Sequence, residues 1–153
     1  MRANRVLTGL ILAMFVTISA QAADDGIGEI RTQLEAARNA GVVLSADVSA
    51  SISRVLAEAL ESDHRGLETA ALRLVIAYSD VVEVGRPAVF EIVRLYRDNE
   101  DDNVRRMAVV ALGATADAWG LDFLERSLPF EDVHAVRHTI RASLAAVGAD
   151  AVS

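Results

Sequence analysis

The chain of 153 residues contains no cysteine, two prolines and nine glycines, and aromatic residues make up only 5% of it. The absence of cysteine excludes disulfide bonds and a lipid-modified N-terminal cysteine. Proline and glycine interrupt helices, so their scarcity, together with abundant alanine, leucine and valine, favours helix over sheet. The composition therefore predicts an all-α protein.

Lysine is absent as well: all 15 basic residues are arginine, and 22 acidic residues outweigh them to give a formal net charge of −7. Loss of Arg2 and Arg5 with the N-terminal segment described next changes this charge to −9 (−7 less two positive charges). Binding to nucleic acid needs a basic surface that neutralises phosphates. The acidic balance therefore argues against nucleic acid as a partner.

Residues 1–22 have the three parts of a secretory signal peptide. Arg2 and Arg5 give a positive start, an apolar stretch covers residues 6–18, and residues 20–22 form a small-residue cleavage site. The apolar stretch is shorter than the about 20 residues that a membrane-spanning helix needs. We therefore expect cleavage after Ala22, a periplasmic or secreted protein of 131 residues (153 less 22), and no membrane insertion after cleavage.

Apolar residues recur at helical spacing along the rest of the chain and predict seven helices, the first at residues 24–40. Serine and aspartate suit helix N-caps, proline suits a first turn, and glycine suits a helix end. These boundary residues are, in chain order, Gly41, Ser45, Asp63, Pro87, Asp101 or Asp102, Pro129 and Gly148, and the acidic pair at 131–132 opens the seventh helix.

A sequence pattern recurs along the helices. Val104-Arg105 followed by Leu112 returns 32 residues later as Val136-Arg137 followed by Leu144, and a related helix begins around Leu67, 37 residues before Val104. One amphipathic helix pair cannot bury its apolar face alone, so successive pairs stack. We predict a repeat domain at 45–148 with units at about 45–79, 86–116 and 118–147, an N-terminal capping helix within 23–44 and a short tail at 149–153.

The run from the acidic residues 101–102 through Val104-Arg105 and Ala108 to Ala111-Leu112-Gly113 resembles the HEAT-repeat family, including its short phycobilin-lyase type. The resemblance covers about residues 45–148. It implies a short right-handed α-solenoid of about three helix pairs, with the Val-Arg helices on the concave side. It also implies a structural ladder between repeats, formed by Arg105 and Arg137 with turn acids such as Asp101 and Asp102. Glu68 replaces the arginine of the first unit and interrupts this ladder.

The chain offers little for catalysis. It has no Gly-x-Ser-x-Gly turn and no phosphate-binding Gly-Lys-Ser/Thr loop. His134 and His138 lie four residues apart with Glu131 one turn earlier, which is a partial ligand set for a divalent metal. Because further ligands are missing, we predict no catalytic residue, no metal and no other cofactor. A small metal- or cofactor-handling HEAT-like enzyme that uses these three residues remains the alternative.

The exposed side of the Val-Arg helices alternates arginine with aliphatic residues, and the repeats differ there. Such a surface either packs against neighbouring repeats, is simply solvated, or accepts an acidic or amphipathic peptide of a partner protein. Trp119 either packs between repeats or contacts the partner. The candidate partner-binding residues are Arg73, Arg106, Val109, Val110, Trp119, His138 and Arg141.

These observations predict a non-catalytic interaction module or scaffold with a protein or peptide partner in the cell envelope. Repeat proteins display such surfaces on a rigid stack of helices, which lowers the ordering cost of binding. A further alternative is a helical subunit of a cell-envelope complex that docks through its uncovered last helix.

Overall fold

The computed structural model describes residues 22–150, so the predicted signal peptide lies, except for Ala22, outside the described residues. The all-α prediction is confirmed: residues 22–150 form seven α-helices and a short 3-10 helix, and no strand. The elements are α1 (Ala22–Asn39), α2 (Ala46–Glu61), α3 (Arg65–Tyr78), α4 (Arg86–Asp98), α5 (Asp102–Thr115), α6 (Ala118–Ser127), the 3-10 helix η2 (Leu128–Phe130) and α7 (His134–Asp150).

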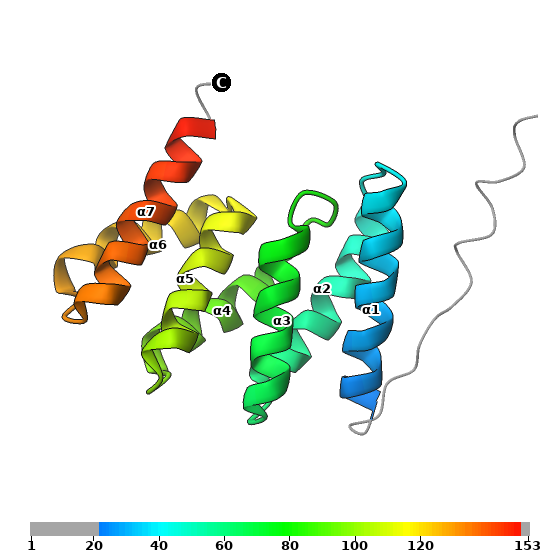
Figure 1. Cartoon of the computed structure of the whole chain (residues 1–153), viewed down its shortest axis with the longest axis horizontal. Helices are drawn as coiled ribbons and strands as arrows, with labels where there is room; N and C mark the ends of the chain where they lie inside the picture. The colour runs from blue at the N-terminus through cyan, green and yellow to red at the C-terminus, as the bar shows by residue number, and fades with distance from the viewer. Residues whose placement is uncertain (1–21, 151–153) are drawn as a thin grey trace, which may run out of the picture.

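The helices form two layers, with α1, α3, α5 and α7 side by side in one row and α2, α4 and α6 behind them (Figure 1). Helix α5 packs against α3 on one side, α7 on the other and α4 behind it. Helix α2 packs against α1, α3 and α4. Each helix of the interior therefore buries more than one face, and the core runs through the whole stack.

Local chemistry sets several helix ends. Asp101 is the N-cap of α5 and its side chain accepts a hydrogen bond from the Asn103 N–H at 2.7 Å, as the sequence predicts. Gly41 ends α1 with a φ of 62°, a left-handed conformation that glycine adopts without steric cost. The N-cap of α3 is His64, so the prediction of Asp63 as its cap is wrong by one residue.

Helix α7 also begins later than the acidic pair at 131–132 suggests, at His134. The carboxylate of Glu131 turns back and accepts a hydrogen bond from the Val133 N–H at 3.0 Å, which holds residues 131–133 in a turn before the helix. This turn places Glu131 against α5, where it becomes part of the site described below.

Two serines of α2 hold the loop between α3 and α4. Ser53 is buried; its hydroxyl donates to the Glu83 carbonyl at 3.0 Å and accepts from the Gly85 N–H at 2.8 Å. The Ser49 hydroxyl accepts from the Glu83 N–H at 3.4 Å. Without these partners, the backbone groups of Glu83 and Gly85 would be partly buried and unpaired. None of the described helices has the length and apolar character needed to cross a membrane.

Candidate functional site

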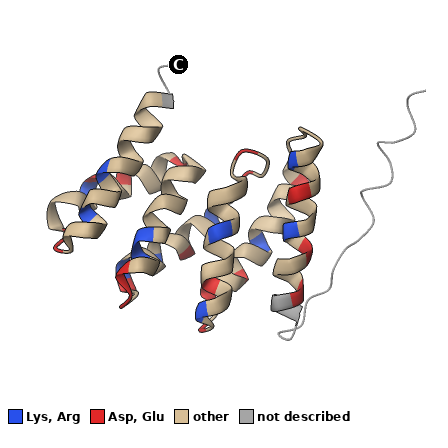
Figure 2. Ribbon diagram, viewed as in Figure 1, with Lys and Arg blue, Asp and Glu red and all other residues tan. Residues whose placement is uncertain are grey.

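Charge is divided unequally between the helices. Helices α3, α5 and α7 together carry six arginines and three acidic residues, a net charge of +3. The remainder of the chain carries nine arginines and nineteen acidic residues, a net charge of −10, which sums with +3 to the total of −7. Figure 2 shows the basic residues on these three neighbouring helices. These three helices are therefore basic although the protein as a whole is acidic, as is α1 in the same row, which has two arginines and four acidic residues.

Four arginines of these three helices are exposed. Arg65 pairs with Asp101, and we call the other three, Arg73, Arg106 and Arg141, the arginine face. Within the described residues, Arg73 and Arg141 make neither an ion pair nor a side-chain hydrogen bond. Arg106 donates from Nε to the Thr139 hydroxyl at 3.2 Å, which joins α5 to α7. The guanidinium groups of this face are thus largely free to bind an anion.

Of the aliphatic residues predicted beside these arginines, only Val110 is exposed, at 38% of its surface. Val109 is fully buried, so its prediction as a partner-binding residue is wrong. The physical reason is that α5 has helices on both sides and behind it, which buries a wider arc than the sequence alignment of repeats suggests. His138 is exposed on α7, which has no helix beyond it in the described residues.

Trp119 lies on α6 and contacts α4. Its ring meets Phe90 edge-on with centroids 4.7 Å apart and stacks on Phe123 at 6.0 Å. Its side chain is partly buried against the core. Trp119 therefore joins α6 to α4 within the rear layer, which is the packing alternative of the sequence analysis, and it does not lie on the arginine face.

Ion pairs do connect neighbouring helices of the front layer. Arg105 Nη2 lies 2.6 Å from Glu131 Oε2 before α7, Nη1 lies 3.3 Å from Asp102, and Nε donates to the Tyr96 carbonyl at 3.0 Å. Between α3 and α5 the pair is Arg65 with Asp101. Arg65 thus bridges the interface at which Glu68 interrupts the sequence pattern.

Arg137 does not continue the predicted ladder. Its Nη2 donates to the backbone carbonyl of Asp132 at 3.2 Å, and its Nε is buried without a hydrogen-bond partner. No helix follows α7 in the described residues to supply a carboxylate. The prediction that Arg137 pairs with a turn acid of another repeat is therefore wrong.

The alternative metal ligands are not brought together. The Glu131 side chain is buried and accepts hydrogen bonds from the Tyr96 hydroxyl at 3.0 Å, from Arg105 at 2.6 Å and from the Val133 N–H at 3.0 Å. His134 and His138 are exposed on α7. No group of three or more histidine, aspartate and glutamate side chains in the described residues is arranged to hold a metal ion.

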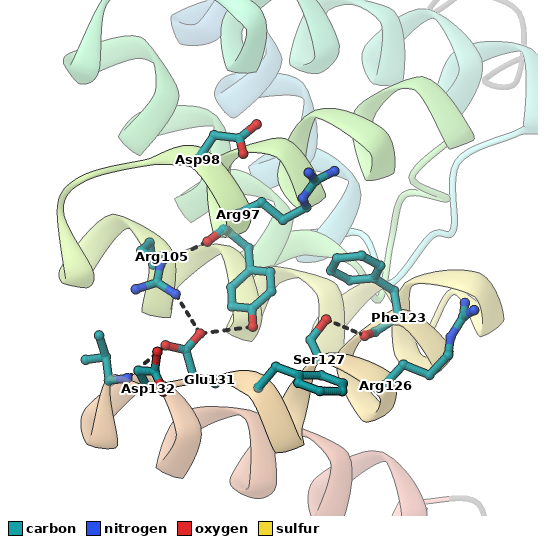
Figure 3. A pocket seen from close by; sticks show the side chains of 11 residues that line it. Arg97, Asp98, Arg105, Phe123, Arg126, Ser127, Glu131 and Asp132 are labelled. Atoms are coloured by element: carbon teal, nitrogen blue, oxygen red, sulfur yellow. Dashed lines mark hydrogen bonds and ion pairs between the residues drawn. The ribbon is translucent and has the colours of Figure 1, made fainter.

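A pocket of about 780 Å³ opens beside Glu131, between the end of α4, the end of α6 and the turn before α7 (Figure 3). We call it the aromatic pocket, because Tyr96, Phe123 and Phe130 line it together with Arg97 and Arg126. Burial and the hydrogen bond to the Glu131 carboxylate raise the pKa of Tyr96 to about 12. The tyrosine therefore stays protonated and continues to donate to Glu131 at neutral pH.

The sequence analysis missed this pocket because its walls come from three segments whose proximity depends on the fold. One signal was present in the sequence. Five of the six aromatic residues between 22 and 150 lie within residues 90–130, and the exception is Tyr78. The structure gathers these five on α4, α6 and η2, with ring contacts from Phe90 through Trp119 and Phe123 to Tyr96.

Comparison of the chain with protein-family models, with curated proteins and with solved structures found no match.

Proposed function

We propose that the chain is an exported, HEAT-like right-handed α-solenoid that binds an acidic segment of a partner protein of the cell envelope without catalysing a reaction. The arginine face is the contact surface. Arg73, Arg106 and Arg141 bind carboxylates of the partner, since a guanidinium offers a planar fork of donors to a carboxylate. Stacked helices hold these residues in place before the partner arrives.

The separation of charge between the helices carries this proposal. A net charge of +3 on α3, α5 and α7 against −10 elsewhere attracts an acidic segment to these three helices and repels it from the rest. Some exposed arginines of the protein are paired, as Arg38 is with Asp80 and Arg126 with Asp122. Arg73 and Arg141 lack such pairs within the described residues.

The test uses a short fluorescein-labelled peptide of alternating glutamate and alanine, with its glutamine counterpart as the uncharged probe. Fluorescence anisotropy gives the affinity of the mature protein at low and at physiological salt. We expect saturable binding of the glutamate peptide only, weakened by salt because exposed charges are screened. The double variant Arg73→Gln, Arg141→Gln should lose most of this binding.

A matched control separates the arginine face from charge in general. Arg31 on α1 and Arg54 on α2 are exposed and make no ion pair within the described residues, so Arg31→Gln, Arg54→Gln changes the net charge equally. Equal loss of binding in both double variants, or equal binding of the glutamine peptide, overturns the proposal.

A further inference from the structure

The aromatic pocket leaves a large apolar side chain uncovered. Phe130 is 83% exposed, the highest value among the large hydrophobic residues that the structure describes. It lies in the 3-10 helix η2 directly after Pro129, whose ring restricts the backbone there. Phe123 forms the neighbouring wall and is fixed by its contacts with Trp119 and Tyr96, each with ring centroids 6.0 Å apart. The pocket thus has one aromatic wall, Phe123, that is packed against other rings, and a second, Phe130, that is open to a ligand.

The charged residues of the aromatic pocket fall into two groups. On one side, Glu131 and Arg105 form an ion pair with 2.6 Å between the carboxylate oxygen and the guanidinium nitrogen. Asp132 lies beyond this pair, away from Phe123 (Figure 3). On the other side, Arg97 and Arg126 extend on either side of Phe123, while Asp98 points away from its ring (Figure 3). The half of the pocket around Phe123 therefore has a positive rim over an aromatic wall.

Both rim arginines are available to a ligand. Arg97 is exposed and makes no ion pair within the described residues. Arg126 pairs with Asp122, but both side chains of this pair are more than half exposed, at 66% and 57%. Exposed pairs of this kind contribute little to stability, so a ligand carboxylate can compete for the guanidinium.

We propose that the aromatic pocket binds an aromatic side chain adjacent to an acidic residue in a partner polypeptide, with the ring against Phe123 and Phe130 and the carboxylate on Arg97. The volume of about 780 Å³ accommodates two such side chains. Ring stacking and a charge-assisted hydrogen bond supply the two parts of the recognition. This inference rests on the proposed function, because it names a second contact of the same partner.

The probe is the peptide N-acetyl-Ala-Phe-Glu-Ala-amide, and the readout is the fluorescence of Trp119, the only tryptophan of the chain, which stacks on Phe123. We expect a saturable change in emission with this peptide. The peptides in which glutamine replaces Glu or alanine replaces Phe should bind more weakly. Because the charge-assisted hydrogen bond to the peptide carboxylate is lost, Arg97→Gln should weaken binding about tenfold.

Phe130→Ala tests the aromatic wall and should also weaken binding; since Phe130 is 83% exposed, its loss leaves the core intact, which far-ultraviolet circular dichroism checks. Arg54→Gln is the control variant, because it removes an exposed arginine of α2 that belongs neither to the pocket nor to the arginine face. Equal affinity for the Phe-Glu and Phe-Gln peptides, no saturable signal, or an unchanged affinity in Arg97→Gln overturns the proposal.

The two binding proposals fail separately. The alternating glutamate and alanine peptide tests the arginine face, and its affinity should be unchanged in Arg97→Gln. If that peptide binds and the Phe-Glu peptide does not, the aromatic pocket proposal fails and the proposed function stands. If only the Phe-Glu peptide binds, the arginine face is not the contact surface.

Discussion

Arg105 on α5 donates from Nη2 to Glu131, 2.6 Å away in the turn before α7, and the same carboxylate oxygen accepts from the Tyr96 hydroxyl at 3.0 Å. One buried carboxylate therefore links α4, α5 and the segment before α7. The side chains of Arg105 and Glu131 are only 17% and 3% exposed, so solvent cannot replace these hydrogen bonds if one partner is lost.

Glu131→Gln should lower the free energy of unfolding by about 1–3 kcal/mol, because the partly buried Arg105 loses the closer of its two carboxylate partners and keeps only Asp102 at 3.3 Å. Urea unfolding followed by circular dichroism measures this change. Asp132→Asn is the matched control: Asp132 is the exposed neighbour, and its side chain makes no hydrogen bond in the described residues. Equal effects of the two substitutions would show that the Glu131 network does not stabilise the fold.

The same network predicts how stability depends on alkaline pH. The pKa of Tyr96 is raised to about 12 in the folded protein from the ordinary tyrosine value of 10.0. Between these two values the unfolded chain has lost the phenol proton and the folded chain retains it, so folding takes up a proton. The contribution is fully present below about pH 10 and is lost as the pH rises toward about 12.

Urea unfolding of the wild type and of Tyr96→Phe between about pH 10 and 12 checks whether the free energy of unfolding falls as the pH rises. The phenylalanine variant lacks the titrating hydroxyl, so its stability should fall less steeply with pH. Tyr78→Phe should keep the full slope because Tyr96 is still present. Parallel pH profiles of the wild type and Tyr96→Phe would contradict the prediction.

The order of helices was predictable because helical periodicity and capping residues are local properties of the sequence. Asp101 as the cap of α5 and Gly41 as the end of α1 follow from a few adjacent residues. Exposure on α5 was less predictable. Val109 and Val110 are adjacent, yet one is fully buried and the other is 38% exposed, and only the placement of α3 and α7 decides between them.

The ion-pair partners of charged residues were predicted less well, because they depend on which side chains the fold brings close together. Repeat alignment assigns the arginine of the first unit to position 68, but Arg65, one turn earlier, reaches Asp101. The spacing of Glu131 from His134 suggests that Glu131 is a metal ligand. In the folded protein, however, its carboxylate pairs with Arg105. The aromatic pocket needs the ends of two helices and a turn to meet, which no sequence pattern in the chain encodes.

The buried hydroxyl of Ser53 provides a further test of the fold. Ser53→Ala should lower the free energy of unfolding by about 1–3 kcal/mol, because it leaves the Gly85 N–H and the Glu83 carbonyl without their partner. Urea unfolding measures the change. Ser51→Ala is the control, since Ser51 bonds only to the Asp47 carbonyl of its own helix. A loss of stability in Ser51→Ala as large as in Ser53→Ala would argue against the role of the loop contacts.

Two helical glycines should respond oppositely to alanine. At Gly28 of α1 an added Cβ meets nothing within 4 Å, so Gly28→Ala should raise the free energy of unfolding by up to about 1 kcal/mol through helix propensity. At Gly113 of α5 the added Cβ would lie 3.0 Å from the Cβ of Ser143 on α7. Relieving this contact separates α5 from α7, and such overpacking costs about 1–3 kcal/mol.

Gly113→Ala should therefore destabilise the protein although alanine is the better helix former. The double variant Gly113→Ala, Ser143→Gly removes the opposing Cβ and should recover most of the lost stability. Thermal unfolding of the wild type, Gly28→Ala, Gly113→Ala and the double variant measures these changes. A gain in stability for Gly113→Ala similar to that for Gly28→Ala would mean that α5 and α7 are not in close contact at this position. No rescue in the double variant would place the strain elsewhere than at Ser143.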